Sequence, residues 1–471
     1  MSKIHFLPVK YGDSFVIECD KGENHGVVVI DGGPNGCGPI LQAQLDQVGT
    51  PDLMVLTHYD DDHIGGLTQY IKACRKAGQL PAREVWANCA KYADTPDDSL
   101  TSTRSALQGV KLGVLLDMIV AEGGELSWRD DVIEGFVKEF PFADIEVVSP
   151  TEKGRQLAIG KQEKVMVGKT LESLTRSMDK SLDVLPPEVE PLEKAALDCP
   201  KPPSEKTDAD VANAASIAIL LRCDGLSALL LGDCYPHNVV DYLRAKGYSE
   251  ENPLEVDFVK VAHHGSLHNT SNELLDLIKS YHFLISTNGD KFGHPDREAF
   301  AHILCHPTRD RSEKVHFYFN SDLKTLKSKS GLFLVEGEEE AYNFEIHECV
   351  RELPLTGDEP ADVEPADVEP TDINPVDDKP KDDKPKDDRP KDTKDTNVKE
   401  TNTKDTNTKD TDAKTAPDSD LNLDAAPSRA IDKADESAEQ PAPAPKKKRV
   451  CFLRRLFSGF RFNLDFSSKK K

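Results

Sequence analysis

Short apolar runs alternate with amphipathic stretches along the first 350 residues of the chain. Residues 27–30 and 53–56 are apolar at every position, which is typical of strands buried on both faces of a sheet. The segments 39–48 and 64–77 follow them and place their apolar residues at helical spacing. Strands that alternate with helices in this way predict an α/β fold.

The same patterns predict further elements up to residue 350. Strands are expected at 4–9, 14–18, 84–86, 142–148, 216–222, 226–231, 256–262, 283–286, 315–319, 331–335 and 342–346. Helices are expected within 100–122 and at 238–246, 272–281 and 297–304. Residues 151–208 carry many charges and prolines, and we expect an insertion or exposed loop with partial helix there.

The composition changes after residue 350. Residues 351–445 are poor in apolar side chains and repeat Asp, Lys, Pro and Thr, which predicts a disordered linker because no core can be buried. Residues 446–471 hold 10 basic residues against the single acid Asp465 and interleave them with Phe and Leu. The chain therefore divides into a domain at 1–350, a linker and a basic aromatic tail.

Charge and cysteine usage narrow the class of protein. The chain has 59 Lys and Arg against 84 Asp and Glu, a formal net charge of −25, which argues against coating nucleic acid through bulk charge. Its 10 cysteines include no CxxC spacing, so we do not expect a cysteine zinc site. We expect the cysteines to be reduced thiols of an intracellular protein. With no signal-peptide pattern and no apolar run near the ~18–20 residues of a membrane span, we expect a cytoplasmic protein.

The residues after the predicted strand at 53–56 crowd ionisable groups together. Five of the six residues 58–63 are His or Asp: His58, Asp60, Asp61, Asp62 and His63. Groups packed this tightly repel one another unless something neutralises them, and mixed imidazole and carboxylate ligands suit a divalent metal. The alternative is an acidic surface turn that contains two histidines.

Other predicted strands also end in His or Asp. Asp31 follows 27–30, Asp233 follows 226–231, and His263 and His264 follow 256–262. Each alone has a structural explanation, as a turn, a helix cap or a polar corner. Because neighbouring strand ends converge on one site in an α/β fold, together they supply ligands for two metals.

These motifs together resemble the metallo-beta-lactamase superfamily over roughly residues 4–350. The stretch 57–67 is similar to the family's His-x-His-x-Asp-His loop, with Asp60 in place of the second His. Gly12-Asp13-Ser14, Ile30-Asp31-Gly32-Gly33, Leu231-Gly232-Asp233 and His263-His264-Gly265-Ser266 resemble its other motifs. The closest branch is the hydrolase domain of the DNA-uptake protein ComEC, which shares the Asp at 60, an Asn-x-x-Ser (Asn213, Ser216) and a Gly-His-Pro (His294).

The resemblance implies a four-layer αββα fold and a binuclear metal centre. It implies that His58 and Asp60 bind the first metal, that Asp62 and His63 bind the second, and that Asp233 bridges both. It also implies that His264 is the last metal ligand, with His263 as the fallback. Asp31 would orient the signature loop.

The sequence departs from the superfamily at the first metal. No histidine stands where its third ligand usually lies, and Asn213, Ser216 or His294 would fill or neighbour that gap. An oxygen-rich first site suits Mn²⁺ or Mg²⁺ as well as Zn²⁺, which is the metal that we expect first.

The resemblance implies hydrolysis by a hydroxide activated between two metals. Asp62 would accept a proton and His294 would meet the leaving oxygen, with a structural turn as the alternative for His294. The ComEC branch implies a phosphodiesterase or nuclease acting on nucleic acid or nucleotides. The alternatives are hydrolysis of a thioester, lactone or lactam, and a non-catalytic scaffold that presents its tail.

The tail allows several interpretations. Residues 446–449 match a nuclear-localisation pattern. The bases and aromatics that follow suit docking on an anionic membrane or a protein partner, or a grip on nucleic acid. A solvated basic tail is the alternative, and we favour a tethered docking segment over a nuclear signal.

Overall fold

The computed structural model describes residues 2–91, 105–167, 189–197, 208–224, 226–331 and 333–354. All of them belong to one compact unit, Met1–Pro380. The linker and the tail predicted at 351–445 and 446–471 lie outside the described residues from 355 onward, so both stay predictions.

Within the described residues, seven strands form the first sheet, in the order β17-β1-β2-β3-β4-β5-β6. β1 to β3 pair antiparallel, and β3 to β6 continue as a parallel sheet. The strands are β1 (Lys3–Phe6), β2 (Phe15–Lys21), β3 (Asn24–Ile30), β4 (Leu53–Leu56), β5 (Glu84–Ala87), β6 (Ser127–Arg129) and β17 (Glu352–Pro354).

Eight strands of the described chain form the second sheet, in the order β16-β15-β14-β12-β10-β9-β8-β7. Its strands from β10 to β16 run parallel. They are β7 (Val137–Glu139), β8 (Asp144–Ser149), β9 (Ala218–Cys223), β10 (Leu226–Leu230), β12 (Phe258–Lys260), β14 (His282–Ile285), β15 (Val315–Phe319) and β16 (Phe344–His347). A small pair, β11 (Leu254–Glu255) and β13 (Ile278–Lys279), lies outside both sheets.

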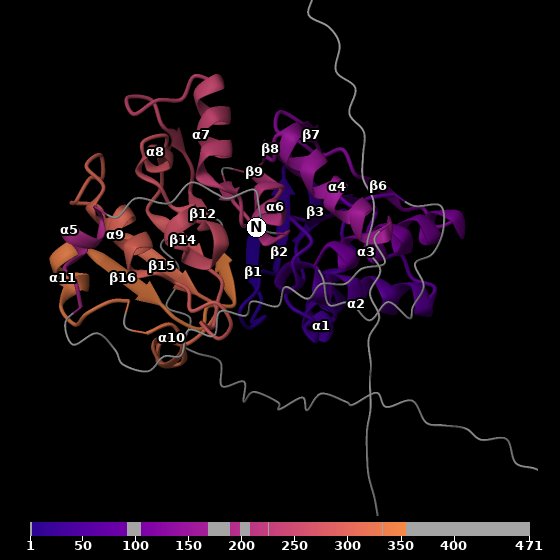
Figure 1. Ribbon diagram of the computed structural model, residues 1–471, viewed down its shortest axis with the longest axis horizontal. Coiled ribbons are helices and arrows are strands. Elements are labelled where there is room, and N and C mark those ends of the chain that lie inside the picture. Colours follow the sequence, from indigo (N-terminus) through magenta and orange to yellow (C-terminus); the bar gives the residue numbers. More distant parts are fainter. Residues whose placement is uncertain are drawn as a thin grey trace, which may run out of the picture. The chain divides into compact units, whose positions relative to one another are not determined.

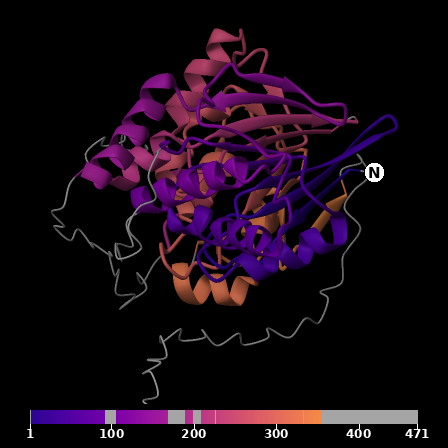
Figure 2. The ribbon, with the colours of Figure 1, turned by 90° about the vertical axis from the view of Figure 1, so that its right-hand side faces the viewer.

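Helices cover the outer face of each sheet. In Figure 1, α1 to α4 gather on one side of the strands and α7 to α9 on the other, and Figure 2 shows the same layers from the side. The helices are α1 (Gly38–Val48), α2 (Asp61–Ala77), α3 (Ser105–Ala121), α4 (Glu152–Val167), α5 (Leu192–Ala195), α6 (Asp208–Ala214), α7 (Pro236–Ala245), α8 (Asn272–Leu275), α9 (Arg297–Cys305), α10 (Leu323–Ser330) and α11 (Glu338–Tyr342), with 3-10 turns η1 (Ala262–Gly265) and η2 (Leu267–Asn269).

Three apolar cores hold these layers together and explain the all-apolar strands. In β3, Val28 and Ile30 face the space between the sheets, where they join Ile219 of the second sheet. Val27 and Val29 point the other way, into the core under α1 and α2. A third core lies between the second sheet and its helices. A strand covered on both faces needs apolar residues at every position, and the predicted four-layer αββα fold is confirmed.

Most predicted elements are present, with differences at their ends. The helix predicted to begin at Ile64 begins at Asp61, so Asp62 and His63 lie in its first turn, where acidic side chains suit the positive end of the helix dipole. The helix predicted at 272–281 is wrong beyond Leu275 because β13 follows it. No described residue of 331–335 is in a strand, so that prediction is also wrong.

The region 151–208 contains three helices, α4, α5 and α6. Gln162 of α4 is fully buried, accepts a hydrogen bond from the backbone N–H of Ala90 and donates one to the carbonyl of Asn88. The residues from 168 to 188 and from 198 to 207 lie outside the described part. No helix in the described ranges is long and apolar enough to cross a membrane.

The start of α2 packs directly against the loop that follows β3. A Cβ added to Gly66 would lie 1.9 Å from the carbonyl oxygen of Gly32, and one added to Gly32 would lie 2.2 Å from the backbone nitrogen of Leu67. Only glycine allows two backbones to approach this closely. The contact fixes the first turn of α2, which carries Asp62 and His63, against the loop that carries Asp31.

Replacing Gly66 with alanine should therefore destabilise the fold. We expect Gly66→Ala to lower the free energy of unfolding by about 1–3 kcal/mol, because the helix must move away from Gly32. Gly160→Ala in α4 is the matched control, since its added Cβ would meet nothing within 4 Å, and it should be neutral or stabilising by up to about 1 kcal/mol. Denaturant unfolding in EDTA measures both, and equal stability of the two variants would contradict the argument.

Candidate metal centre

The carboxyl ends of four strands bring the predicted site residues together. Asp31 follows β3, His58 follows β4, Asp233 follows β10, and His263 and His264 lie in η1 just after β12. Asp31, His58, Asp233 and His264 are buried. The N-terminus of α2 adds Asp60, Asp62 and His63 to the same place.

Asp31 holds the loop after β4 from beneath. Its carboxylate accepts hydrogen bonds from the backbone N–H of Thr57 at 2.8 Å, from the Thr57 hydroxyl at 2.7 Å and from Nδ1 of His63 at 2.7 Å. It does so from a left-handed backbone conformation, with φ of 58°. Asp31 thus orients both Thr57 and His63.

The hydrogen bonds of His58 and His63 fix where each ring carries its proton. The Nδ1 atom of His63 must donate, because its partner is the carboxylate of Asp31. Thr57 gives its only hydroxyl proton to Asp31, so its oxygen accepts from Nδ1 of His58 at 3.1 Å. In both neutral rings Nε2 is left with a lone pair.

The two adjacent histidines of η1 are fixed in the same way. The Nδ1 atom of His264 donates to the carbonyl oxygen of Ser286 at 2.7 Å. Asn269 uses its amide N–H groups on the carbonyls of Asp233 and the next residue, so its Oδ1 atom accepts from Nδ1 of His263 at 3.0 Å. All four histidines therefore turn an Nε2 lone pair inward.

These Nε2 atoms face carboxylate oxygens, an arrangement that needs a cation, either a second proton on the imidazole or a metal ion. The distances to Oδ2 of Asp233 are 3.3 Å from Nε2 of His63, 3.7 Å from His263, 3.8 Å from His264 and 3.9 Å from His58. Nε2 of His264 is also 3.4 Å from Asp62, and Nε2 of His58 is 3.6 Å from Asp60. Buried lone pairs that face carboxylates without a hydrogen bond are costly. The donor set fits divalent metal ions.

The pKa shifts report the same electrostatic field. Burial lowers the pKa of His63, but the carboxylates of Asp233 and Asp31 outweigh it and raise that pKa well above its ordinary value. Burial likewise opposes the charged form of His264, and Asp233 and Asp13 raise its pKa to about 9. Burial raises the pKa of Asp233, but the charges of His63 and His264 hold it well below its usual range. Burial lowers the pKa of His263 to about 4, so that ring stays neutral. The centre attracts positive charge.

Four overlapping groups of ligand atoms lie at this centre among the described residues, each with its atoms within 4.8 Å of one another. Two contain Asp13, whose carboxylate pairs with Lys260. The other two are His58, His63 and Asp233, and Asp62, His63 and His264. His63 belongs to both of these groups, whereas the sequence assigns it to the second metal alone. Asp233 lies close to Nε2 of all four histidines, the position of a shared ligand.

His263 and His264, treated in the sequence as alternatives, both face Asp233. Their φ angles are 48° and 57°, a left-handed pair of conformations that is rare outside glycine and concentrates at functional sites. His263 thus adds a further imidazole nitrogen beside Asp233.

The other candidates for that gap lie differently. The Ser216 hydroxyl accepts the backbone N–H of Asp233 at 3.0 Å and thereby positions the loop. Asn213 hydrogen bonds to Ser216 through its backbone carbonyl. The ring of His294 lies beside that of His263, with centroids 5.3 Å apart, and its Nδ1 atom is 3.4 Å from Asp296. His294 flanks the cluster rather than joining its carboxylates.

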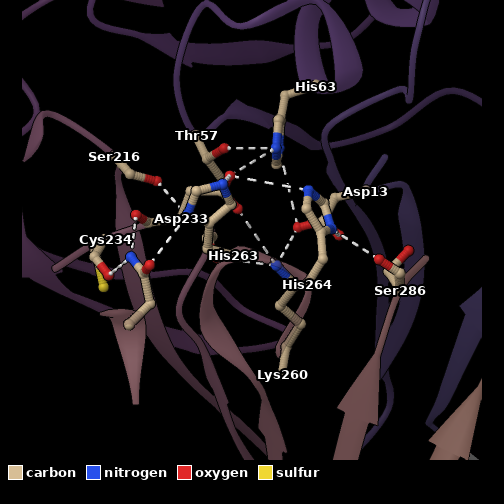
Figure 3. A network of polar contacts seen from close by, with 12 residues as sticks. Asp13, Thr57, His63, Ser216, Asp233, Cys234, Lys260, His263, His264 and Ser286 are labelled. Atoms are coloured by element: carbon tan, nitrogen blue, oxygen red, sulfur yellow. Dashed lines mark hydrogen bonds and ion pairs between the residues drawn. The ribbon is translucent and has the colours of Figure 1, made fainter. Parts of the chain in front are cut away.

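The sequence reading missed a buried ion pair beneath the centre. Lys260, only 1% exposed, pairs with Asp13, donates to the carbonyl of Gly232 at 2.9 Å and lies 3.7 Å from Oδ1 of Asp233. In Figure 3, Lys260 reaches the network from one side and His63 from the other. Burial lowers the pKa of Lys260, but Asp13 and Asp233 outweigh it and raise that pKa, so the ammonium is charged. The sequence does contain a signal for this buried charge, because Lys260 is a single lysine within an otherwise apolar strand.

The carboxylates of the network outnumber its one ammonium, an excess of negative charge that favours bound cations. The carboxylates are those of Asp13, Asp31, Asp60, Asp62 and Asp233, and the ammonium is that of Lys260.

Comparison with known proteins gives a family match over part of the chain. Residues 7–149 match the model of the metallo-beta-lactamase superfamily, a range that includes Asp31 and the stretch from His58 to His63. Asp233 and His264 lie beyond that range. A comparison with curated proteins finds no match.

Several solved structures resemble the chain at low identity. A metallo-beta-lactamase from Cronobacter sakazakii is 10% identical over 56% of this chain and 78% of its own, with a TM-score of 0.24. A mutant of the CmlA beta-hydroxylase is 11% identical over 75% of this chain and 54% of its own, with a TM-score of 0.32. A beta-lactamase from Chitinophaga pinensis is 9% identical over 50% and 71%, with a TM-score of 0.23. Likeness at this level says nothing about substrate.

Removal of single carboxylates should change the metal content selectively. We expect Asp233→Asn to lose bound Zn²⁺ relative to the wild type, and Asp31→Asn to weaken binding by about 10–100-fold, because the His63 ring loses its orienting partner. Asp61→Asn is the matched control, since Asp61 also lies in the first turn of α2 but contacts Gln108. Metal analysis after dialysis against EDTA and reloading with Zn²⁺ measures the three. Unchanged metal content in Asp233→Asn would refute the assignment.

Proposed function

Because the chain carries a metallo-beta-lactamase superfamily domain, we propose that it is a metal-dependent hydrolase of phosphodiesters in nucleotides or nucleic acid. The observation that carries the hydrolase proposal is the convergence of four Nε2 lone pairs on the carboxylate of Asp233. Two divalent ions held there would supply an acidified water and polarise the oxygen of the scissile group.

The side chains around the ions take separate roles in this proposal. His58, His63, His263 and His264 would bind through nitrogen. Asp31 orients the ring of His63, and Asn269 orients that of His263. Burial raises the pKa of Asp62, but His264 and His63 outweigh it and hold that pKa far below its usual range. So acidic a carboxyl is a weak proton acceptor, and we assign Asp62 to metal binding first.

His294 remains the proposed partner of the leaving oxygen. Its ring lies beside that of His263 and is partly exposed at the edge of the cluster. A proton donor at this edge reaches a substrate oxygen without occupying a ligand position. The alternative for His294 is a structural role in its turn.

The rim of the centre favours a substrate with a base and a phosphate. Phe292, 39% exposed, lies parallel to the ring of His264 with centroids 6.4 Å apart, and it makes a T-shaped contact with Tyr11 with centroids 5.9 Å apart. The ammonium of Lys291 is 4.9 Å from the Phe292 ring and 5.0 Å from the Tyr11 ring. An exposed aromatic face stacks on bases, and an ammonium pairs with phosphate. This rim supports a phosphodiester over a thioester, lactone or lactam.

The donor set also bears on the metal. Four inward nitrogens make the centre richer in imidazole than the sequence predicts, because His263 joins His264. Imidazole suits Zn²⁺ better than Mg²⁺. We therefore propose Zn²⁺, with Mn²⁺ as the next candidate.

Other proposals rest on the sequence alone. We propose a likeness to the ComEC branch and a cytoplasmic location. We also propose that residues 446–471 dock on a partner or an anionic membrane. A non-catalytic scaffold is disfavoured by the nearly complete ligand set.

Hydrolysis assays should separate the competing reactions. With Zn²⁺ or Mn²⁺, we expect turnover of bis(p-nitrophenyl) phosphate and of DNA or RNA, and a loss of at least about 100-fold in Asp62→Ala because a ligand is removed. Asp61→Ala should keep its activity. Turnover of esters or lactams without phosphodiesters would favour the alternative reaction. A lack of both metal and turnover would exclude either enzyme.

The rim should affect substrate binding more than chemistry. Phe292→Ala should raise KM for an oligonucleotide by about 5-fold to 150-fold, the range expected for one lost base stack, with kcat little changed. Phe292→Trp should restore KM, while Val335→Ala, with the same exposure, should leave it unchanged. An unaltered KM in Phe292→Ala would remove the support for a base-bearing substrate.

A further inference from the structure

A second histidine cluster lies on the second sheet, away from the centre described above. His316 lies in β15, and Glu345 and His347 lie in β16, the edge strand of the sheet. The register places His316 beside Glu345, and His347 lies two residues further along β16. Residues two apart on a strand point to the same face, so all three side chains share one face of the sheet.

The ligand atoms of this cluster are already close together. Nδ1 of His316 is 2.9 Å from Nε2 of His347 and 4.0 Å from a carboxylate oxygen of Glu345. The three ligand atoms lie within 4.8 Å of one another. Around a tetrahedral zinc with bonds of about 2.0–2.1 Å, ligand atoms lie roughly 3.3 Å apart. Shifts of about 1 Å or less would bring the three atoms to that spacing.

Packing holds the rings in these positions. The ring of His347 stacks on Tyr318 with centroids 4.7 Å apart, and the ring of His316 stacks on His282 with centroids 5.0 Å apart. The hydroxyl of Tyr318 is in turn 3.0 Å from Nδ1 of His282. Rings locked by their neighbours lose little freedom when they bind a ligand. The cluster is only half-buried, so an ion can enter from solvent.

We propose that His316, Glu345 and His347 form a second metal site, which binds Zn²⁺ independently of the hydrolytic centre. Two imidazoles and one carboxylate with a fourth position open to water suit zinc. The strand order separates the sites, because β15 and β14 lie between β16 and β12, which at about 4.8 Å per strand is roughly 14 Å. Bound metal would fasten the edge strand β16 to β15.

Lys314 gives the proposal a distinctive prediction. Its ammonium lies 3.2 Å from the carboxylate of Glu345, where it occupies the oxygen that a metal would use. A metal must displace this ammonium, so the lysine weakens binding. Removal of the charge by Lys314→Met should tighten Zn²⁺ binding several-fold, an effect that a purely structural histidine stack would not produce.

The test uses Zn²⁺ alone on the full chain after dialysis against EDTA. Calorimetric titration and metal analysis should show one equivalent fewer in His347→Ala than in the wild type, with phosphodiester hydrolysis unchanged. Glu345→Gln, which keeps the shape of the side chain, should weaken this site by at least about 10-fold. Asp233→Asn should retain the site, and its loss of metal should add to that of His347→Ala.

Two outcomes would overturn the proposal. One is an equal number of Zn²⁺ equivalents in His347→Ala, Glu345→Gln and the wild type, which would leave a hydrogen-bonded imidazole pair only. The other is the loss of all bound Zn²⁺ in Asp233→Asn. Because the readout is metal content at a separate place, failure here is distinguishable from failure of the proposed hydrolase.

Discussion

Mutual repulsion among the buried carboxylates of Asp13, Asp31, Asp62 and Asp233 and the half-buried carboxylate of Asp60 is the constraint on which the rest of the structure depends. Lys260 neutralises one negative charge from below, through Asp13. The positive end of α2 lies close to Asp60 and Asp62. Neither removes the remaining negative charge, which raises the pKa of His63 and His264. The donor set therefore fits divalent cations, which would neutralise the carboxylates in place of imidazole protons.

The layers of the fold position this charge. The carboxyl ends of β4, β10 and β12 point into one place because both sheets stack across a common apolar core. The close approach of Gly66 to Gly32 fixes the position of the start of α2 next to these strand ends. Hydrogen bonds from Nδ1 atoms then set the angle of each ring. Packing of the sheets and helices places the ligand residues, and hydrogen bonds orient their side chains. The site needs both.

The sequence predicts the parts of this site that follow from strand ends. Asp31, His58, Asp233 and His264 each follow an apolar run, so the rule for α/β folds finds them. His263 is harder, because adjacent side chains usually point apart, and only the left-handed φ of both residues turns both rings toward Asp233. The strand wrongly predicted at 331–335 is an apolar run whose Phe333 and Leu334 are buried without pairing as a strand. The missed α10 has a different cause. A helix rich in Lys and Ser, with Leu326 its one buried residue, gives little periodic signal.

The metal centre and the proposed substrate rim also share one loop, which couples their geometry. Asp13 pairs with Lys260 beside the candidate metal ligands, and Tyr11 lies two residues earlier in the rim. Ser286 accepts the proton of His264 on its carbonyl and donates its hydroxyl to the carbonyl of Gly12 at 2.6 Å. The ring of Phe292 in turn lies parallel to that of His264, with centroids 6.4 Å apart. A shift of this loop would move a metal ligand and the aromatic rim together, so recognition of a base and activation of its phosphodiester would depend on the same contacts.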